Sequence, residues 1–272
     1  MARVAGLFHY PIKGCAAVEV NEGHLGLAGL AADRAFMVVD AEGGFLSQRR
    51  TPGLAVVRPA LDDSGDRLTL AAPGVESLAL AVDPAGPRRP VRLHGKDFSG
   101  ADQGDGAAEW FSSLLGRACR LVRVPPEHDR VTDGETPGTS GYADSSAVLV
   151  VATGSVADLN ARIADGGGDA VPMDRFRPNV VVSGWDEPYA EDRARRIEVG
   201  QAELGFTKLA IRCAVTTVDQ RTGRRSGPEP LRTLAGFRRR PGGVALGAKF
   251  SVVRAGKVSV GDEFRVRDWA TA

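Results

Sequence analysis

Short apolar runs, separated by glycine, proline or aspartate, recur along most of this 272-residue chain. Runs of about four to eight residues with turn residues at both ends are typical of β-strands. Many such strands at regular spacing favour a sandwich or barrel architecture. The sequence therefore predicts a mainly β fold with a few helices (α+β).

The apolar pattern predicts strands in both halves of the chain. A hairpin is expected where the run Ala35–Asp40 is followed by the turn AEGG and then Phe45–Gln48. The other expected strands are Leu54–Arg58, Arg67–Leu70, Leu78–Val82, Val91–His94, Cys119–Val124, Ala147–Ala152, Asn179–Ser183, Arg196–Val199, Leu204–Cys213, Val215–Val218, Phe250–Arg254 and Glu263–Val266.

Three segments are expected to be helical. Ala107–Leu115 is followed by Gly116, a residue typical of helix ends. In Ser155–Ala164, Ser155 and Asp158 have the spacing of a capping box. Glu229–Arg240 is basic and amphipathic, and ends in three arginines.

The segment Pro125–Ser140 is rich in proline, glycine, threonine and acidic residues. Such composition predicts a long loop or a linker, and loops of this length are uncommon in compact domains unless they are functional or mobile. We therefore expect two β-rich units, residues 1–124 and 141–268, with a linker or loop at 125–140.

The charge balance argues against a general nucleic-acid binder. The chain has 35 basic and 34 acidic residues, a net charge of +1, whereas nucleic-acid-binding proteins usually carry a basic excess. A local basic site is still compatible with this balance.

The cysteines and the apolar runs predict a cytoplasmic protein. Cys15, Cys119 and Cys213 form no C-x-x-C pair, which argues against a zinc knuckle or a cysteine-ligated iron–sulfur cluster. Their sparse, odd number favours a reducing compartment. The N-terminus lacks the apolar stretch of a signal peptide, and no apolar run approaches the ~20 residues of a membrane span.

Cys213 has two interpretations. On a regular strand it would share one face with Ile211 and Val215 and be a small core residue. As a thiolate it would be a soft metal ligand or a nucleophile, and Arg212 could lower its pKa or hold an anion. Arg212 and Cys213 can serve one site only if the strand bends or bulges there.

Two basic motifs are candidate anion sites. In Tyr10-Pro11-Ile12-Lys13-Gly14-Cys15, Lys13 and nearby amides could contact an anion, and Gly14 would allow close backbone approach. The alternative is a plain lysine at a strand end. Asp33-Arg34 can equally be an exposed ion pair.

A third basic motif leads into a strand. Pro178 should keep Arg177 extended, which would put Arg177 and Asn179 on one face of the strand. A guanidinium and an amide there suit a phosphate or the edge of a heterocycle, and a solvated strand end is the alternative. Ser145 and Ser146, after Asp144, could bind an anion or form a surface turn.

Several familiar catalytic motifs are missing from the sequence. His9, His24, His94 and His128 show no H-x-x-x-H spacing, which weakens the case for a histidine metal centre. Dinucleotide and P-loop glycine motifs and the G-x-S-x-G elbow are also absent. Tyr189–Asp192 (YAED) could supply carboxylates, although a solvated loop explains it equally well.

Taken together, these segments resemble the MOSC family, named for the C-terminal domain of molybdenum cofactor sulfurase. The similarity is to its two-part members, which include amidoxime-reducing enzymes. It implies an N-terminal β-barrel module followed by a MOSC β-barrel domain, over nearly the whole chain. The segments that carry it are Tyr10–Cys15, Asp33–Asp40, Phe45–Arg50, Ser155–Ile163, Phe176–Gly184, Tyr189–Asp192 and Arg212–Gly223.

The resemblance implies a molybdenum cofactor, a pyranopterin dithiolene (molybdopterin) that carries the metal. In the family the cysteine of an R-C-x-x-T-T-V-D motif ligates molybdenum, and this position is Cys213. Its YPxK, DR and FRPN motifs bind the pterin and its phosphate. The cofactor-binding residues implied here are Lys13, Gly14, Arg34, Ser145, Ser146, Arg177, Asn179, Arg212 and Cys213.

The implied activity is the two-electron reduction of N-hydroxylated small molecules, and pyridoxal phosphate is not required for it. Because the chain ends at Ala272 without a ferredoxin-type C-x4-C-x2-C motif, we expect a separate electron-donor protein of the ferredoxin, flavoprotein or cytochrome type. Arg238–Arg240 is one candidate surface for an acidic donor. The alternatives are a carrier of the cofactor or of sulfur that uses Cys213, and a β-barrel binding module without cofactor.

Overall fold

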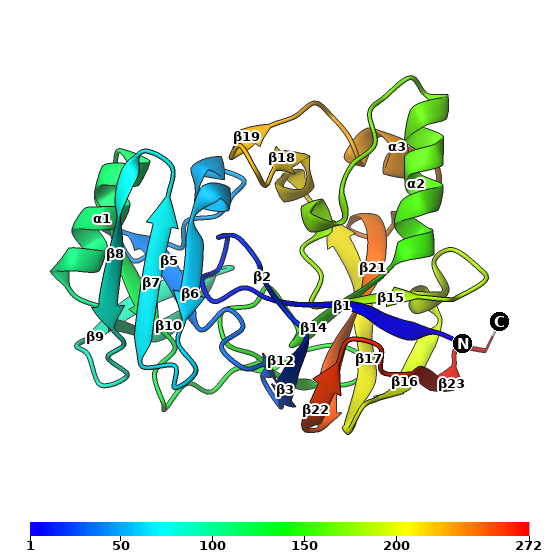
Figure 1. The fold of residues 1–272 in the computed structure, drawn as a ribbon, viewed down its shortest axis with the longest axis horizontal. Coiled ribbons are helices and arrows are strands. Elements are labelled where there is room, and N and C mark those ends of the chain that lie inside the picture. Colours follow the sequence, from blue (N-terminus) through cyan, green and yellow to red (C-terminus); the bar gives the residue numbers. More distant parts are fainter. Residues whose placement is uncertain (272) are drawn as a thin grey trace.

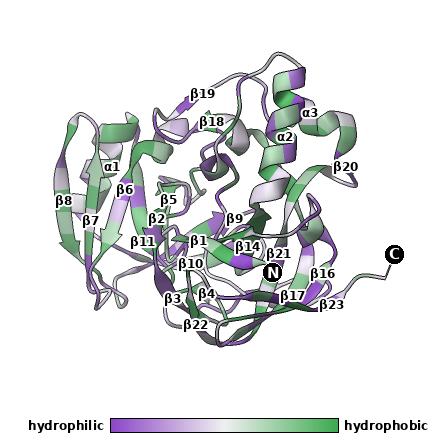
Figure 2. Ribbon diagram, turned by 45° about the vertical axis from the view of Figure 1, so that its right-hand side comes forward, coloured by the Kyte–Doolittle hydropathy of each residue, from purple (hydrophilic) through white to green (hydrophobic). Residues whose placement is uncertain are grey.

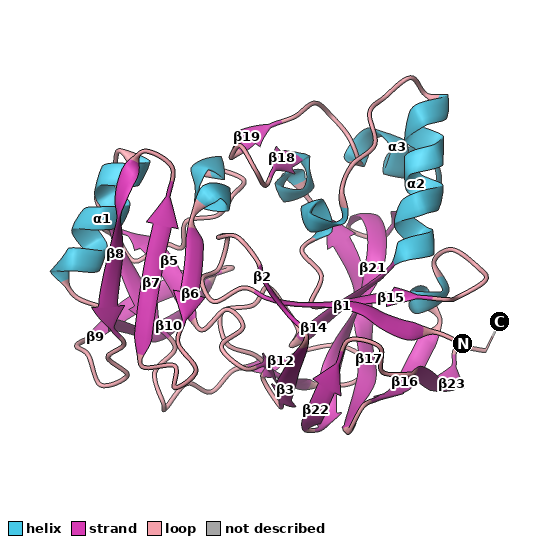
Figure 3. Cartoon of the chain, in the orientation of Figure 1, coloured by secondary structure: helices cyan, strands magenta, loops and turns pink. Residues whose placement is uncertain are grey.

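The computed structural model describes residues 1–271, which form two β-rich bodies side by side (Figure 1). The prediction of a mainly β fold with a few helices is confirmed, and strands dominate both bodies (Figure 3). Three α-helices lie within the described residues. None of the helices in this part of the chain has the length and apolarity needed to cross a bilayer.

The first body contains two small antiparallel sheets and one helix. The helix α1 packs against β11 and β8, and its apolar face joins a core that includes Phe36, Leu68 and Phe111. Its end is as predicted, because Gly116 takes the left-handed conformation that closes a helix. The elements are β5 (Phe36–Asp40), β11 (Cys119–Arg123), β10 (Lys96–Asp102) and β9 (Arg88–Leu93) in one sheet, β6 (Arg58–Leu61), β7 (Arg67–Ala72) and β8 (Val75–Ala81) in the other, and α1 (Asp105–Leu115).

The second body is built on a nine-stranded sheet, ordered β2-β1-β15-β14-β21-β17-β16-β23, with β20 paired to β21. Helices α2 (Thr153–Asp165) and α3 (Leu231–Phe237) lie beside one end of it (Figure 1). Its strands are β1 (Arg3–His9), β2 (Val18–Val20), β14 (Val148–Ala152), β15 (Val180–Ser183), β16 (Ala194–Val199), β17 (Ala202–Arg212), β20 (Arg239–Arg240), β21 (Gly243–Arg254) and β23 (Phe264–Trp269).

The first strand of the chain belongs to the second body. β1 pairs antiparallel with β15, and its buried Val4 and Leu7 join the core of the large sheet. A smaller sheet likewise joins β22 (Gly256–Ser259) to β3 (Glu22–Gly26) and β4 (Gly29–Leu30). The first strands therefore pack away from the first body, because their apolar faces are buried against strands of the C-terminal half. The sequence boundaries at 124 and 141 stay a prediction.

Three predicted strands were wrong in part. Leu54–Arg58 is mostly the 3-10 helix η1 (Pro52–Val56), which begins at a proline. Val215–Val218 is mostly the 3-10 helix η4 (Ala214–Thr217), where threonine hydroxyls donate to backbone carbonyls three residues earlier. The expected hairpin at Phe45 is short: the return segment makes a single bridge, with Val39, and the Leu46 amide donates to the Val38 carbonyl.

The predicted capping box was also wrong. α2 begins at Thr153, and the Ser155 hydroxyl donates to Glu191 Oε2 at 2.8 Å and accepts from the Tyr189 amide at 2.7 Å. The Asp158 carboxylate accepts instead from the Tyr189 hydroxyl and from an arginine one turn further along. Ser155 and Asp158 therefore bond to Tyr189 and Glu191, which lie 31 to 36 residues further along the chain, and the local pattern does not reveal these partners.

The segment between the two units is folded onto the second body. It contains the short strands β12 (Val131–Thr132) and β13 (Gly138–Thr139), and the Thr136 amide donates to the Phe206 carbonyl of β17 at 2.9 Å. The Glu135 amide donates to the Thr207 carbonyl of the same strand at 3.0 Å. These bonds fix the segment against β17, so it passes between the two bodies as an ordered connection.

Candidate functional site

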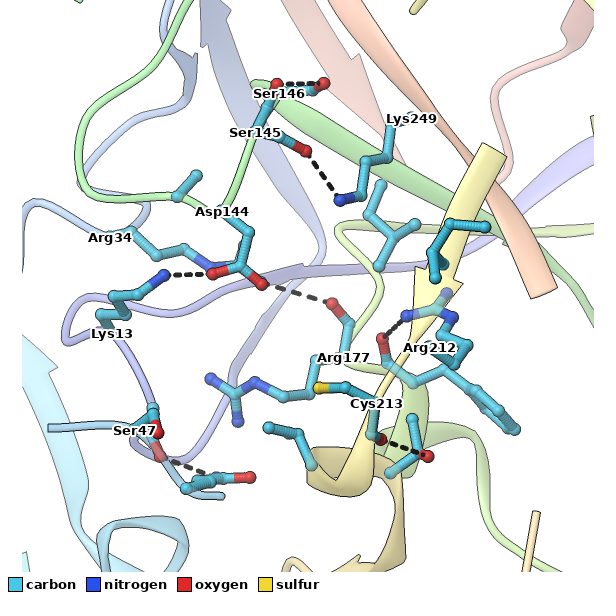
Figure 4. Close-up of a pocket in the computed structure, with 18 of the residues that line it drawn as sticks. Lys13, Arg34, Ser47, Asp144, Ser145, Ser146, Arg177, Arg212, Cys213 and Lys249 are labelled. Atoms are coloured by element: carbon cyan, nitrogen blue, oxygen red, sulfur yellow. Dashed lines mark hydrogen bonds and ion pairs between the residues drawn. The ribbon is translucent and has the colours of Figure 1, made fainter. Parts of the chain in front are cut away.

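A cavity of about 250 Å³ lies where the two bodies meet, and both halves of the chain line it (Figure 4). Figure 4 shows the labelled basic side chains and the Cys213 sulfur pointing toward this common space. The lining segments are residues 13–14, 34, 45, 47–49 and 94 from the first half, and 143–146, 148–149, 175–177, 179, 211–213, 215–216 and 249 from the second half.

Cys213 lies at the point where strand β17 ends. The strand has a register irregularity before Ile211, and the backbone of Cys213 begins the 3-10 helix η4. As a result, Arg212 and Cys213 both line the cavity, as the predicted bend requires. Cys213 is exposed, whereas Cys15 and Cys119 are buried. The alternative of a buried core cysteine is therefore excluded, while its role as a metal ligand stays a prediction.

Arg177 has a conformation that the sequence did not predict. It is left-handed, with φ 54° and ψ 49°, at the end of the 3-10 helix η2 (Met173–Phe176), so the prediction of an extended residue before Pro178 was wrong. Its guanidinium lies 4.2 Å above the Tyr10 ring, and Nη1 donates to Gln220 Oε1 at 3.1 Å. These contacts hold the side chain against the cavity wall.

Arg34 lies against the same buried ring. Its guanidinium is 4.1 Å from the centre of the Tyr10 ring, and it donates to both Asp33 carboxylate oxygens at 2.6 and 2.7 Å. The Tyr10 hydroxyl donates to the Pro178 carbonyl at 3.0 Å. Burial raises the pKa of Tyr10 to about 12, so the ring stays neutral between two cations. One tyrosine thus links the basic motifs of the two halves.

Asn179 lines the cavity but uses its amide for the fold. Its Oδ1 accepts from the Leu149 amide and its Nδ2 donates to the Phe8 carbonyl, both at 3.1 Å. The side chain therefore joins β14 to β1 at the cavity edge. A direct contact of this amide with a ligand stays a prediction.

Lys13 and Asp144 form an ion pair across the two halves of the chain. The Asp144 carboxylate is largely exposed in the cavity, and His94 Nε2 lies 3.2 Å from its Oδ1. Neighbouring Lys13 holds the pKa of Asp144 well below its usual range, while burial lowers the pKa of Lys13. Gly14 follows with φ +84°, a conformation that favours glycine, and its carbonyl accepts from Gln48.

Ser145, Ser146 and Lys249 also line the cavity. Lys249 Nζ donates to Ser145 Oγ at 2.7 Å, and Ser146 Oγ donates to the Ser145 carbonyl. Burial lowers the pKa of Lys249 from its ordinary value of 10.5 to about 8.

All nine residues proposed from the sequence lie in this one cavity lining, although their binding roles stay predictions. Sequence reasoning missed Lys249, His94 and Arg175. A lysine inside the apolar run of β21 was the available signal for Lys249. His94 stands in a turn and Arg175 in the 3-10 helix η2, and no local pattern distinguishes either of them.

The lining has a strong excess of positive charge: seven of its residues are lysine or arginine and one, Asp144, is acidic. Within residues 1–271, no carboxylate forms an ion pair with Arg177 or Arg212, and Nη2 of each is buried without a hydrogen-bond partner. Burial lowers the pKa of Arg212 to about 10. Because unsatisfied buried donors are costly, this arrangement is suited to an anion with several acceptor oxygens.

Comparisons with known proteins agree with this two-part organisation. Residues 1–118 match the MOSC N-terminal beta barrel domain, and residues 137–265 match the MOSC domain. The chain is 35% identical to mitochondrial amidoxime-reducing component 1 of Mus musculus, over 95% of this chain and 80% of the relative. The human protein of that name is also 35% identical, over 86% and 72%. Molybdenum cofactor sulfurase of Danio rerio is 32% identical, over 85% of this chain and 30% of that protein.

Proposed function

Because this chain belongs to the MOSC domain family, we propose that it is a molybdenum-cofactor-dependent oxidoreductase that reduces N-hydroxylated compounds. Proteins of this family typically bind a molybdenum cofactor. Relatives that match most of the chain are named as amidoxime-reducing components. One observation carries the proposal: the exposed Cys213 lies in a cavity with buried arginine donors that have no partner.

The residues of the cavity fit the chemistry of that cofactor. Its phosphate offers oxygen acceptors for the open Nη2 donors of Arg177 and Arg212. A thiolate from Cys213 is a soft ligand, which suits a transition metal that changes oxidation state. The excess of positive charge offsets the negative charge of the phosphate and of the dithiolene.

The cofactor, when bound, supplies the two-electron redox chemistry, and the chain positions it. Conversion of an N–OH group to N–H, with release of water, consumes two electrons and two protons. Lys249 holds a proton on Nζ at neutral pH, and its pKa of about 8 suits transfer of that proton to the leaving oxygen. His94, beside Asp144 at the exposed side of the cavity, can carry protons from solvent.

The decisive test is turnover together with metal content. Protein expressed in a host that makes the cofactor should contain about one molybdenum per chain and reduce benzamidoxime to benzamidine with reduced methyl viologen. The variant Cys213→Ala should lose turnover, whereas Cys119→Ala, which changes a cysteine outside the cavity lining, should keep it. Full activity in Cys213→Ala would refute the proposal.

A carrier of the cofactor or of sulfur is the second candidate. The exposed Cys213 thiol and the similarity to a protein named molybdenum cofactor sulfurase support it. A carrier would bind molybdenum but reduce none of a panel of amidoximes and hydroxylamines. It would also pass the cofactor, or a persulfide sulfur from Cys213, to an acceptor protein, and this transfer can be measured directly.

A further inference from the structure

Two exposed basic segments meet at the edge of the cavity. Arg49 lines the cavity, and its carbonyl accepts from Arg225 Nη2 at 2.7 Å. This contact joins the loop before η1 to the hairpin of β18 (Val218–Asp219) and β19 (Arg224–Arg225), which reaches from the second body toward the first (Figure 1). We refer to the following five residues as the rim arginines: Arg49, Arg50, Arg221, Arg224 and Arg225.

The hairpin is fixed against the first body. Gly223, at its turn, has φ +65°, and a Cβ atom there would lie 3.1 Å from Val56 Cγ1 and 3.3 Å from the Pro52 carbonyl oxygen. Glycine therefore allows the hairpin to approach η1 closely. Beneath it, Gln48 and Gln220 exchange amide hydrogen bonds of 3.0 and 3.1 Å. The rim arginines are thus carried on an ordered connection between the two bodies.

The rim arginines have no counter-charge. All five are exposed, and across residues 1–271 no carboxylate lies within ion-pair distance of any of them. Figure 2 shows strand β19 in the colour of hydrophilic residues. Exposed like charges repel one another, so this cluster does not stabilise the isolated chain. By contrast, Arg238 of the predicted donor surface Arg238–Arg240 is buried and paired with Asp192, so that surface offers fewer free charges.

We propose that the rim arginines are the docking surface for an acidic electron-transfer protein, an inference that rests on the proposed function. Reduction of an N–OH compound consumes two electrons per turnover, and a donor must deliver them close to the cavity. Complementary charge raises the rate of such encounters, and electron-transfer complexes are typically small and transient. A surface that begins at a cavity-lining residue brings the donor to the site that must be reduced.

The test uses the double charge reversal Arg221→Glu and Arg224→Glu, two residues outside the cavity lining. The probe is a chemically reduced, acidic plant-type ferredoxin. We expect kcat/KM for the ferredoxin to fall at least about tenfold at low ionic strength, and the difference from the unchanged protein to shrink at high ionic strength. Turnover of benzamidoxime with reduced methyl viologen, a small reductant, should stay unchanged.

The matched control reverses Arg239→Glu and Arg240→Glu, an exposed basic pair on β20. Equal losses in both double variants would mean that only net charge matters, and would overturn the assignment of the surface. An unchanged kcat/KM for ferredoxin in the rim variant would also overturn it, as would tighter binding of a single-stranded RNA than of ferredoxin to the same arginines.

A failure of the proposed function would be distinguishable. If the unchanged protein does not turn over with methyl viologen, calorimetric titration of the full chain with the same ferredoxin still tests the surface. Binding that weakens in the rim variant would support the docking surface without the reaction. No binding by the unchanged protein at low ionic strength would overturn it.

Discussion

Two buried arginines of the second body stack on tyrosine rings at the same distance but differ in their partners. Arg238 lies 4.2 Å above Tyr189, donates to Asp192 Oδ2 at 2.5 Å and to the Ala245 carbonyl, and is 6% exposed. Arg177 lies 4.2 Å above Tyr10 and is 9% exposed, but its Nη2 has no partner. Burial and aromatic stacking are alike, and only the hydrogen-bond partners differ.

This difference distinguishes Arg238, whose charge is used within the fold, from Arg177, which has a donor available to a ligand. With its charge paired, Arg238 joins η3 (Ala190–Asp192) to β21. Burial lowers the pKa of Arg177, which reflects the cost of keeping its charge out of water. A buried donor without a partner is usual only where a ligand or water completes the site. For these two arginines, the open Nη2 donor and not the degree of burial distinguishes the one that lines the cavity.

The largest expected effect is on folding, at Arg238. The variant Arg238→Met leaves Asp192, whose side chain is only 13% exposed, without its cation, and should lower the free energy of unfolding of the cofactor-free chain by about 3 kcal/mol. In Arg177→Met the change should stay within about 1 kcal/mol, because no carboxylate is left unpaired. Urea denaturation of both variants measures this difference. Equal destabilisation of the two variants would contradict the distinction between Arg238 and Arg177.

The next largest effect is on retention of the cofactor, for which Arg177 should matter more than Arg238. Arg177→Met should weaken retention of the molybdenum cofactor by about 1.5–3 kcal/mol, or at least tenfold, because one charge-assisted contact to its phosphate is lost. Molybdenum and pterin content after gel filtration measures retention. Arg162→Met provides the control, since Arg162 also stacks on an aromatic ring at 4.2 Å but lies outside the cavity lining. Undiminished occupancy in Arg177→Met would remove Arg177 from the binding site.

The smallest expected effect is a pH dependence at Lys249. Its pKa of about 8 means that one positive charge near Asp144 and Arg212 is lost as the pH rises through 8. Affinity of the cofactor-free protein for inorganic phosphate should then fall about fivefold, because one charged contact is lost. Calorimetry from pH 7 to 9 measures it. In Lys249→Met this step should disappear, and a step of the same size there would assign it to another group.

The free energy of unfolding should change with pH in the opposite direction to the phosphate affinity. Because the pKa of Lys249 is about 8 in the folded chain but 10.5 ordinarily, the unfolded chain binds more protons between these values. The contribution of Lys249 to the free energy of unfolding therefore rises with pH from about 8 to 10.5. Comparing denaturation curves of the unchanged chain and Lys249→Met over this interval isolates the contribution.

Local sequence patterns determined the elements and the position of the candidate thiol. Turn-bounded apolar runs predicted a mainly β chain, and Gly116 marked the end of α1. The strand before Cys213 was expected from its apolar residues, and the need for a bend followed from the period of two along a strand. These features depend on neighbours in the chain, so the sequence alone was sufficient for them.

Contacts between distant residues were decided only by the tertiary structure. The bond from Tyr10 to the Pro178 carbonyl spans 168 positions, and the pair of Lys13 with Asp144 spans 131. No local pattern encodes which arginine finds a carboxylate, that Ser155 turns from its own helix to Glu191, or that the first strand joins the second body. Burial, pairing and the shape of the cavity depend on where the whole chain packs, because each is a balance of desolvation against partners supplied from elsewhere in the fold.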